Sequence, residues 1–194
     1  MSSLQRLHLI FAGSSHCSDE TLNHLTDGIK FTCNNLESLK LQFYTCEKIT
    51  DKGVGYVSGM CKHMRQLRLF RLDLYECGRV YEKGVFSLTE GLANMKSLDF
   101  LKLSLTDAAG ITDSTVGSLV EVLKSLPELK KFSADFSSCW KLSDIGISKI
   151  QQGVKQLGDK FYSLELKVAK CMKVTTSALN SFEKELGSLE KLKS

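Results

Sequence analysis

Cysteine and histidine are the residues of this sequence with the widest chemistry, because both bind metals and act in catalysis. The seven cysteines are Cys17, Cys33, Cys46, Cys61, Cys77, Cys139 and Cys171, and the four histidines are His8, His16, His24 and His63. No two cysteines form Cys-x-x-Cys and no two histidines are four residues apart, so the spacings typical of zinc sites are missing. The sequence also lacks a glycine-rich phosphate loop and a Ser–His–Asp order. We therefore predict no metal, no cofactor and no enzymatic activity.

The spacing of the cysteines reveals an internal repeat instead. Cys46 and Cys77 are 31 residues apart, and Cys139 and Cys171 are 32 residues apart. Apolar residues recur in the same columns, so six copies of 31–32 residues begin near residues 4, 36, 67, 98, 129 and 161. These copies fill residues 1–194 as one domain. Repeats of this length are typical of stacked solenoid units.

Each copy combines two periodicities. Leu39, Leu41 and Phe43 alternate with polar residues, which predicts a strand. Between Val54 and Met64 the apolar residues are spaced by three and four, which predicts an amphipathic helix. Stacking of such units aligns the strands in one parallel sheet, with the helices on its other side and the strands lining a concave face.

Three columns of residues mark the start of each predicted helix. A hydroxyl residue that can cap the helix stands at Ser18, Thr50, Thr112, Ser143 and Thr175. An acid follows at Asp19, Asp51, Glu82, Asp113 and Asp144, where it suits the positive end of the helix dipole. The small residues Thr21, Gly53, Gly84, Thr115, Gly146 and Ala178 come two positions later. They indicate a close approach of the helix to the sheet or to a neighbouring helix.

The repeat resembles the leucine-rich repeat family. The segment from Leu36 to Asp51 is similar to the cysteine-containing subclass that is found behind F-box domains. The longer period and the extra alternation from Leu101 to Leu105 are similar to the ribonuclease-inhibitor-like repeats of protists. The resemblance implies an α/β right-handed solenoid, or horseshoe, with one parallel sheet on its concave face. It also implies binding of a protein partner.

Two roles are open for the cysteine column, which consists of Cys46, Cys77, Cys139 and Cys171. Adjacent strands lie about 4.8 Å apart, so neighbouring thiols would be close enough to oxidise. Ser14 and Ala108 fill the same column in other copies, which favours a small residue buried where the strand turns. Cys33 is expected near the end of the first helix and partly exposed.

Residues that point away from the helices form rows across the predicted strands. The first row contains His8, Lys40, Arg71 and Lys102, the second contains Asp73, and the third contains Tyr44 and Tyr75. Like charges on neighbouring strands are unfavourable unless a partner neutralises them, and tyrosine and arginine are enriched at binding hot spots. We predict that these seven residues bind an acidic, partly apolar segment of a protein. The alternative is a solvated face with no binding role.

Trp140 and the two ends of the array carry further expectations. Trp140 follows the cysteine column and is expected either to anchor a contact at the rim or to fill the gap between neighbouring repeats. Leu7, Leu9 and Phe11 of the first copy are expected to be open on one side. The polar sixth helix is expected to close its own end.

Composition and resemblance together favour a non-enzymatic interaction module or scaffold subunit. The net charge of +4 is too small for a nucleic-acid binder, and no apolar run reaches the roughly 18 residues of a membrane helix. We expect a protein partner in a larger assembly, without nucleic acid or membrane. The odd cysteine count and the absence of a secretory signal favour a cytoplasmic location. The resemblance leaves two alternatives, substrate recognition in an F-box-type ubiquitin ligase and enzyme inhibition of the ribonuclease-inhibitor type.

Overall fold

The computed structural model describes residues 4–14, 16–32, 35–157 and 160–190, in which six strands alternate with six helices. The strands are β1 (Arg6–Ala12), β2 (Ser38–Tyr44), β3 (Leu69–Tyr75), β4 (Phe100–Ser104), β5 (Lys131–Asp135) and β6 (Ser163–Lys167). The helices are α1 (Asp19–Thr32), α2 (Asp51–Cys61), α3 (Glu82–Leu92), α4 (Asp113–Ser125), α5 (Asp144–Leu157) and α6 (Thr176–Glu190). We call one strand and the helix that follows it a coil.

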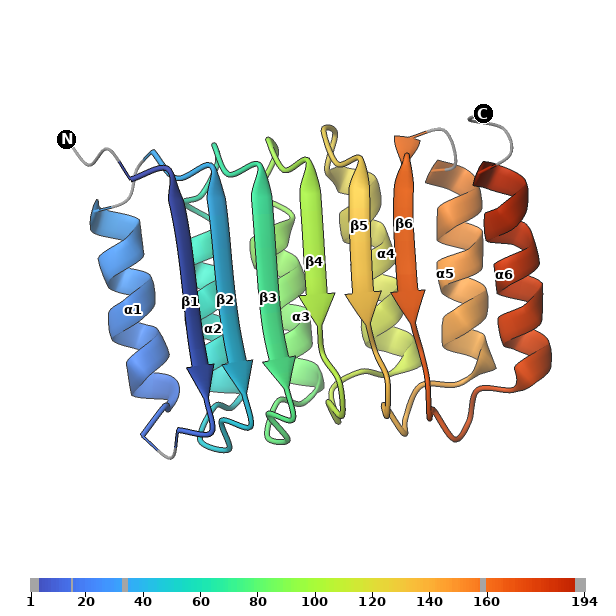
Figure 1. Cartoon of the computed structure of the whole chain (residues 1–194), viewed down its shortest axis with the longest axis horizontal. Coiled ribbons are helices and arrows are strands. Elements are labelled where there is room, and N and C mark those ends of the chain that lie inside the picture. Colours follow the sequence, from blue (N-terminus) through green and yellow to red (C-terminus); the bar gives the residue numbers. More distant parts are fainter. Residues whose placement is uncertain (1–3, 15, 33–34, 158–159, 191–194) are drawn as a thin grey trace.

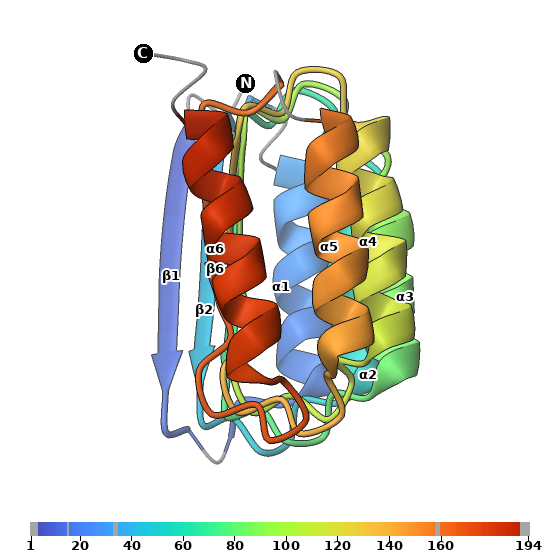
Figure 2. The ribbon, with the colours of Figure 1, turned by 90° about the vertical axis from the view of Figure 1, so that its right-hand side faces the viewer.

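The described strands form one sheet in the order of the chain, and each neighbouring pair is parallel. The helices cover one face of the sheet (Figure 1), and the side view shows them all on that face (Figure 2). We call the opposite face the free face. Paired residues are 31 or 32 positions apart, as for Leu39 with Phe70 and Phe132 with Leu164. The predicted alternation of strands and helices and the parallel sheet are confirmed.

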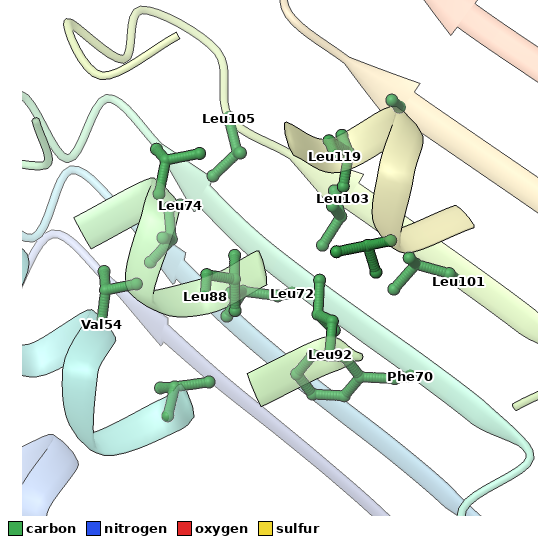
Figure 3. Packing of buried hydrophobic residues seen from close by; sticks show 14 of the residues in the cluster. Val54, Phe70, Leu72, Leu74, Leu88, Leu92, Leu101, Leu103, Leu105 and Leu119 are labelled. Atoms are coloured by element: carbon green, nitrogen blue, oxygen red, sulfur yellow. The ribbon is translucent and has the colours of Figure 1, made fainter. Parts of the chain in front are cut away.

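The apolar core lies between the sheet and the helices. Phe70, Leu72 and Leu74 of β3 are almost completely buried, and they pack against the layer that contains Leu88 and Leu92 of α3 (Figure 3). The inward residues of neighbouring strands are in register, so each coil adds one layer to a continuous core. A single coil has no core of its own, because its apolar face is covered only by its neighbours.

The two end coils bury their apolar residues less completely than the middle ones. Leu9 of β1 and Leu166 of β6 are only partly buried, whereas Leu72 and Leu103 at the same repeat position are fully buried. The expectation of a first layer that is open on one side is confirmed. At the other end α6 contributes the buried side chain of Phe182.

Hydroxyl side chains cap the helices largely as predicted. The hydroxyl oxygens of Thr50 and Thr112 accept hydrogen bonds from backbone N–H groups of the first helical turn, at 3.2 and 3.3 Å. Ser143 and Thr175 cap α5 and α6 in the same way. The first coil differs, because the backbone N–H of Ser18 donates to the hydroxyl of the residue three positions later, at 3.2 Å.

The acids of the second column connect neighbouring coils, which the dipole argument did not predict. Oδ1 of Asp113 accepts the N–H groups of Ser143 at 2.9 Å and Gly146 at 3.0 Å, and its Oδ2 accepts the Ser143 hydroxyl at 2.6 Å. Asp19 makes the same three contacts with the start of α2. Asp51 and Asp144 contact the starts of α3 and α6. We call these four contacts carboxylate bridges.

The carboxylate bridges explain the column of small residues. A Cβ atom on Gly84 would lie 2.5 Å from Oδ1 of Asp51 and 3.1 Å from its Cα. At the start of α4 the partner from the third coil is the longer Glu82 instead of an aspartate, and Thr115 occupies the small column and completes a local capping box. The close approach is therefore between the first turns of neighbouring helices, which is the second of the two alternatives stated for this column.

A left-handed residue follows each described strand. The residues are Gly13, Thr45, Glu76, Asp107, Ser138 and Lys170, with φ between 53° and 62°. The N–H groups of Thr45 and Ser138 each donate to a carbonyl of the next coil at 2.8 Å, so the inter-coil hydrogen bonds continue beyond the strands. The sequence analysis missed this column because five of its six members are not glycine.

Candidate functional site

The free face presents a row of three cations. Lys40 of β2 pairs with Arg71 of β3, and Arg71 pairs with Lys102 of β4. All three side chains are half-buried, and His8 continues the row on β1. These strand pairings confirm the register that the repeat predicted for the four residues. Because neighbouring strands lie about 4.8 Å apart, the positive charges are close together.

Asp73 is more deeply placed than the sequence suggested. It is only 4% exposed, and its Oδ2 accepts a hydrogen bond from Nη2 of Arg71 at 3.2 Å. Among the described residues, Oδ1 of Asp73 and Nε of Arg71 are buried without a hydrogen-bond partner. The ion pair neutralises part of the cationic row but leaves two buried polar atoms unsatisfied, which weakens its net contribution to stability.

Gln42 connects the predicted residues, although the sequence analysis did not include it in the site. Its Oε1 is hydrogen-bonded to Nε2 of His8, and its Nε2 donates to the Tyr44 hydroxyl and, at 3.5 Å, to Oδ2 of Asp73. Burial, with a smaller effect of the Asp73 charge, raises the pKa of Tyr44, so its hydroxyl stays protonated at neutral pH. The sequence could have indicated that Gln42 belongs to the site, because the repeat places it beside Asp73 in the second outward row.

Tyr44 and Tyr75 lie side by side at the ends of β2 and β3. Their ring centroids are 6.3 Å apart and their planes make an angle of 62°, which is an edge-to-face contact. Tyr75 is exposed, and Tyr44 is half-buried. The two rings are paired in the register that the repeat predicted, and together they offer an amphipathic surface beside the row of cations.

An open pocket of about 210 Å³ extends the site toward β5 and β6. Its lining includes Arg71, Asp73, Lys102, Ser104, Ser133, Asp135 and Lys167. The hydroxyl of Ser133 donates to Glu165 at 2.8 Å and, together with Lys167 at 3.4 Å, lowers the pKa of that carboxyl group. The sequence analysis left out this half of the face because Ser133 and Glu165 interrupt the row of cations.

The cysteines among the described residues are buried and unpaired. The thiols of Cys139 and Cys171 donate to the carbonyl oxygens of Leu105 and Phe136 in the preceding coil, at 3.3 and 3.2 Å. Burial raises the pKa of Cys139 to about 12, so this thiol stays protonated at neutral pH. Within the described ranges, no three histidine, cysteine or acidic side chains gather into a group that could hold a metal ion. Cys33 lies outside the described residues.

Trp140 lies in the loop between β5 and α5 and is 47% exposed. The ammonium group of Lys141 is 5.0 Å from the centre of its ring. The sequence left two roles open for Trp140, a contact at the rim and filling of the gap between coils. The second role can involve only the buried half of the side chain. The exposed half is available for a contact at the rim.

Comparisons with known proteins add no family assignment. The chain matches no protein-family model, and no curated protein matches it. In the part of the chain that the structure describes, no helix is both long enough and apolar enough to span a membrane. The functional argument therefore depends on the surface of the molecule itself.

Proposed function

We propose that this chain is a non-enzymatic protein-binding module of the leucine-rich repeat type, in which the free face is the concave face of the solenoid. The observation that carries the proposal is the stack of Lys40, Arg71 and Lys102 on three adjacent strands. Unpaired thiols suit a reducing compartment, so we place the module in the cytoplasm.

The row of cations favours a partner segment with acidic side chains. Among the described residues, the ammonium groups of Lys40 and Lys102 have no hydrogen-bond or ion-pair partner, whereas Arg71 is held by Asp73. A carboxylate bound between neighbouring cations relieves their mutual repulsion. Tyr44 and Tyr75 supply the adjoining apolar contact, with little loss of side-chain entropy because the two rings already pack together.

Charge reversal of the two unpaired lysines tests this function. We choose Lys40→Glu with Lys102→Glu and leave Arg71 unchanged, because its loss would strand the buried carboxylate of Asp73. The tagged chain is used for affinity isolation from its own organism, and bound proteins are identified by mass spectrometry. We expect a stoichiometric partner that the double variant binds at least roughly tenfold more weakly.

The matched control is Lys62→Glu with Lys83→Glu, which makes the same charge change at exposed positions at the end of α2 and in α3. This control variant should retain the partner. Retention of the partner by the Lys40/Lys102 variant would move the binding site away from the free face and contradict the proposal.

A further inference from the structure

Trp140 and Met172 occupy the same repeat position in two adjacent loops. Each directly follows a buried cysteine whose thiol is hydrogen-bonded to the preceding coil. The cysteine holds the backbone in place, so the next side chain projects outward; Trp140 is 47% exposed and Met172 is 86% exposed. Both loops lie at the edge of the molecule toward which the strands run, the lower edge in Figure 1. Ile145, in the first turn of α5 at this edge, is also exposed.

Positive charge surrounds these apolar side chains. The loops spanning residues 136–143 and 168–175 contain Lys141, Lys170 and Lys173 and have no aspartate or glutamate in the sequence. The nearby carboxylate of Asp144 is already bound to Thr175 in a carboxylate bridge. We call this surface the C-terminal rim; it consists of Trp140, Lys141, Ile145, Lys170, Met172 and Lys173.

The corresponding loops of earlier coils have a different character. Those of the second, third and fourth coils carry the acids Glu47, Glu76 and Asp107, that of the first coil has no lysine, and Gly78 and Ala109 stand at the repeat position of Trp140 and Met172. The combination of protruding apolar side chains with uncompensated lysines is therefore confined to the last two coils. The repeat alone does not require it, because the same loop geometry is built in earlier coils from small and acidic residues.

We propose that the C-terminal rim docks on the surface of an anionic lipid bilayer. Trp140 and Met172 enter the headgroup layer, and the lysines contact the negatively charged lipids. Exposed apolar side chains beside uncompensated lysines supply the two contributions on which binding to a bilayer surface depends, burial of apolar area and attraction to anionic lipids. The expectation of no membrane partner came from the hydropathy of the sequence, which bears on helices that cross a bilayer and not on loops that touch its surface.

This docking is independent of the proposed protein-binding function. With the C-terminal rim on the bilayer, the strands point toward the lipid and the free face stays open at the side (Figure 2). The acids Glu47, Glu76 and Asp107 limit the contact to the last coils, since an anionic surface repels them. The molecule would thus present its binding face close to a membrane.

The chain carries its own probe for this contact, because Trp140 is its single tryptophan. Intrinsic fluorescence is recorded while the protein is titrated with vesicles of phosphatidylcholine alone or with about one-third phosphatidylserine. We expect a blue shift of the emission with the anionic vesicles only, and its loss at high salt. No shift with anionic vesicles, or an equal shift with neutral ones, would overturn the proposal.

A charge variant separates the C-terminal rim from the rest of the edge. Lys141→Gln with Lys170→Gln and Lys173→Gln keeps the tryptophan probe and should weaken vesicle binding roughly 100-fold, since each lysine near the surface contributes about fivefold. The matched control removes three charges as well, by Lys48→Gln with Arg79→Gln and Lys83→Gln, and it should change binding less than about threefold. Lys48 and Arg79 stand at the repeat position of Lys141 and Lys173, and Lys83 is exposed in α3.

Two other outcomes count against the membrane. Equal weakening by both variants would show that overall charge, and not the C-terminal rim, drives the binding. A blue shift produced by polyglutamate but not by the anionic vesicles would assign the rim to an acidic protein segment.

A second variant tests the apolar side chains of the rim. Trp140→Ser with Met172→Ser should reduce the binding measured by vesicle sedimentation. Its circular dichroism should be unchanged, because both side chains are exposed.

Discussion

The left-handed residue after each strand concentrates backbone strain at one position per coil. Thr45 has φ of 53° although it is β-branched, and the left-handed region costs such a residue about 1–2 kcal/mol. The strain is tolerated because the N–H of Thr45 bonds to the carbonyl of Tyr75 in the next coil. Gly13 takes the same conformation without the cost.

Substitution at this column should therefore change stability in opposite directions. We expect Thr45→Asn to raise the free energy of unfolding by about 0.5–1 kcal/mol, since asparagine adopts the left-handed conformation more readily. Gly13→Ala should lower it by about 1 kcal/mol, although a Cβ there would meet no atom closer than 3.8 Å. Urea denaturation measures both. A loss of stability in Thr45→Asn would show that the column is not strained.

A fully buried thiol makes stability depend on pH above neutrality. Burial raises the pKa of Cys61 from 9.0 to about 12. The unfolded chain therefore ionises first, so the contribution of this thiol is fully present below pH 9 and is lost as the pH rises toward 12. The expected loss is about 1.4 kcal/mol per pH unit above pH 9. Cys61→Ala should make the decline of the free energy of unfolding between pH 9 and pH 11 shallower by this amount. An unchanged slope would contradict the raised pKa of Cys61.

At the scale of the helices, the carboxylate bridges hold neighbouring coils together. Asp113 lies in the first turn of α4, and its three hydrogen bonds go to the start of α5. Hydrogen bonds to a charged acceptor are stronger than neutral ones, and they satisfy N–H groups that a helix start leaves unpaired. Each bridge thus caps one helix with a residue of the previous one.

Removal of one bridge should weaken the junction between α4 and α5. We expect Asp113→Ala to lower the free energy of unfolding by about 2 kcal/mol. A double-mutant cycle with Ser143→Ala should give a coupling energy of roughly 1 kcal/mol, because the two side chains bond directly. Asp27→Ala is the control, since Asp27 forms only a half-exposed pair with Lys30 inside α1 and should cost less than about 0.5 kcal/mol. Additive effects at positions 113 and 143 would argue against the bridge.

Two glycines in helices should respond differently to alanine. At Gly84 a Cβ would collide with Asp51, so Gly84→Ala should destabilise the protein by at least about 1 kcal/mol. At Gly59 of α2 no atom lies within 4 Å of the new Cβ, so Gly59→Ala should stabilise it by about 0.5–1 kcal/mol. Thermal unfolding compares the two variants. The same sign of change for both would contradict the close approach of α2 and α3.

At the scale of the whole molecule, stability is a property of neighbouring coils. Each strand pairs with the next one and each helix packs against the next one along the chain. In such an array the interfaces between coils carry most of the stability, and the end coils have one interface instead of two. The partial exposure of Leu9 and Leu166 reflects this difference.

Equivalent substitutions should therefore cost more in the middle of the array than at its start. We expect Leu72→Ala to lower the free energy of unfolding by about 3–4 kcal/mol and Leu9→Ala by about 1–2 kcal/mol, since Leu72 is fully buried and Leu9 is not. Native-state hydrogen exchange should likewise show the strongest protection in β3 and β4. Equal costs at the two positions would show that the ends are covered as well as the middle.

Much of the fold follows from local periodicity. The alternation of Leu39, Leu41 and Phe43 and the helical spacing after Val54 predict a strand and a helix, and the 31–32-residue interval predicts their stacking. The register that brings Lys40 beside Arg71 follows from the same interval. These features depend on residues close in sequence or at a constant offset, so the amino-acid sequence alone determined them.

Other features were decided only by the tertiary structure. No pattern of neighbouring residues in the sequence predicts the three hydrogen bonds of Asp113 to the start of α5. The same is true of the burial of Asp73 and Gln42 on the free face and of the left-handed residues after the strands. Each depends on atoms about 30 residues away in the chain, whose distance is set by how closely the coils pack. A hydrogen bond is sensitive to tenths of an ångström, whereas a repeat period specifies only which residues are neighbours.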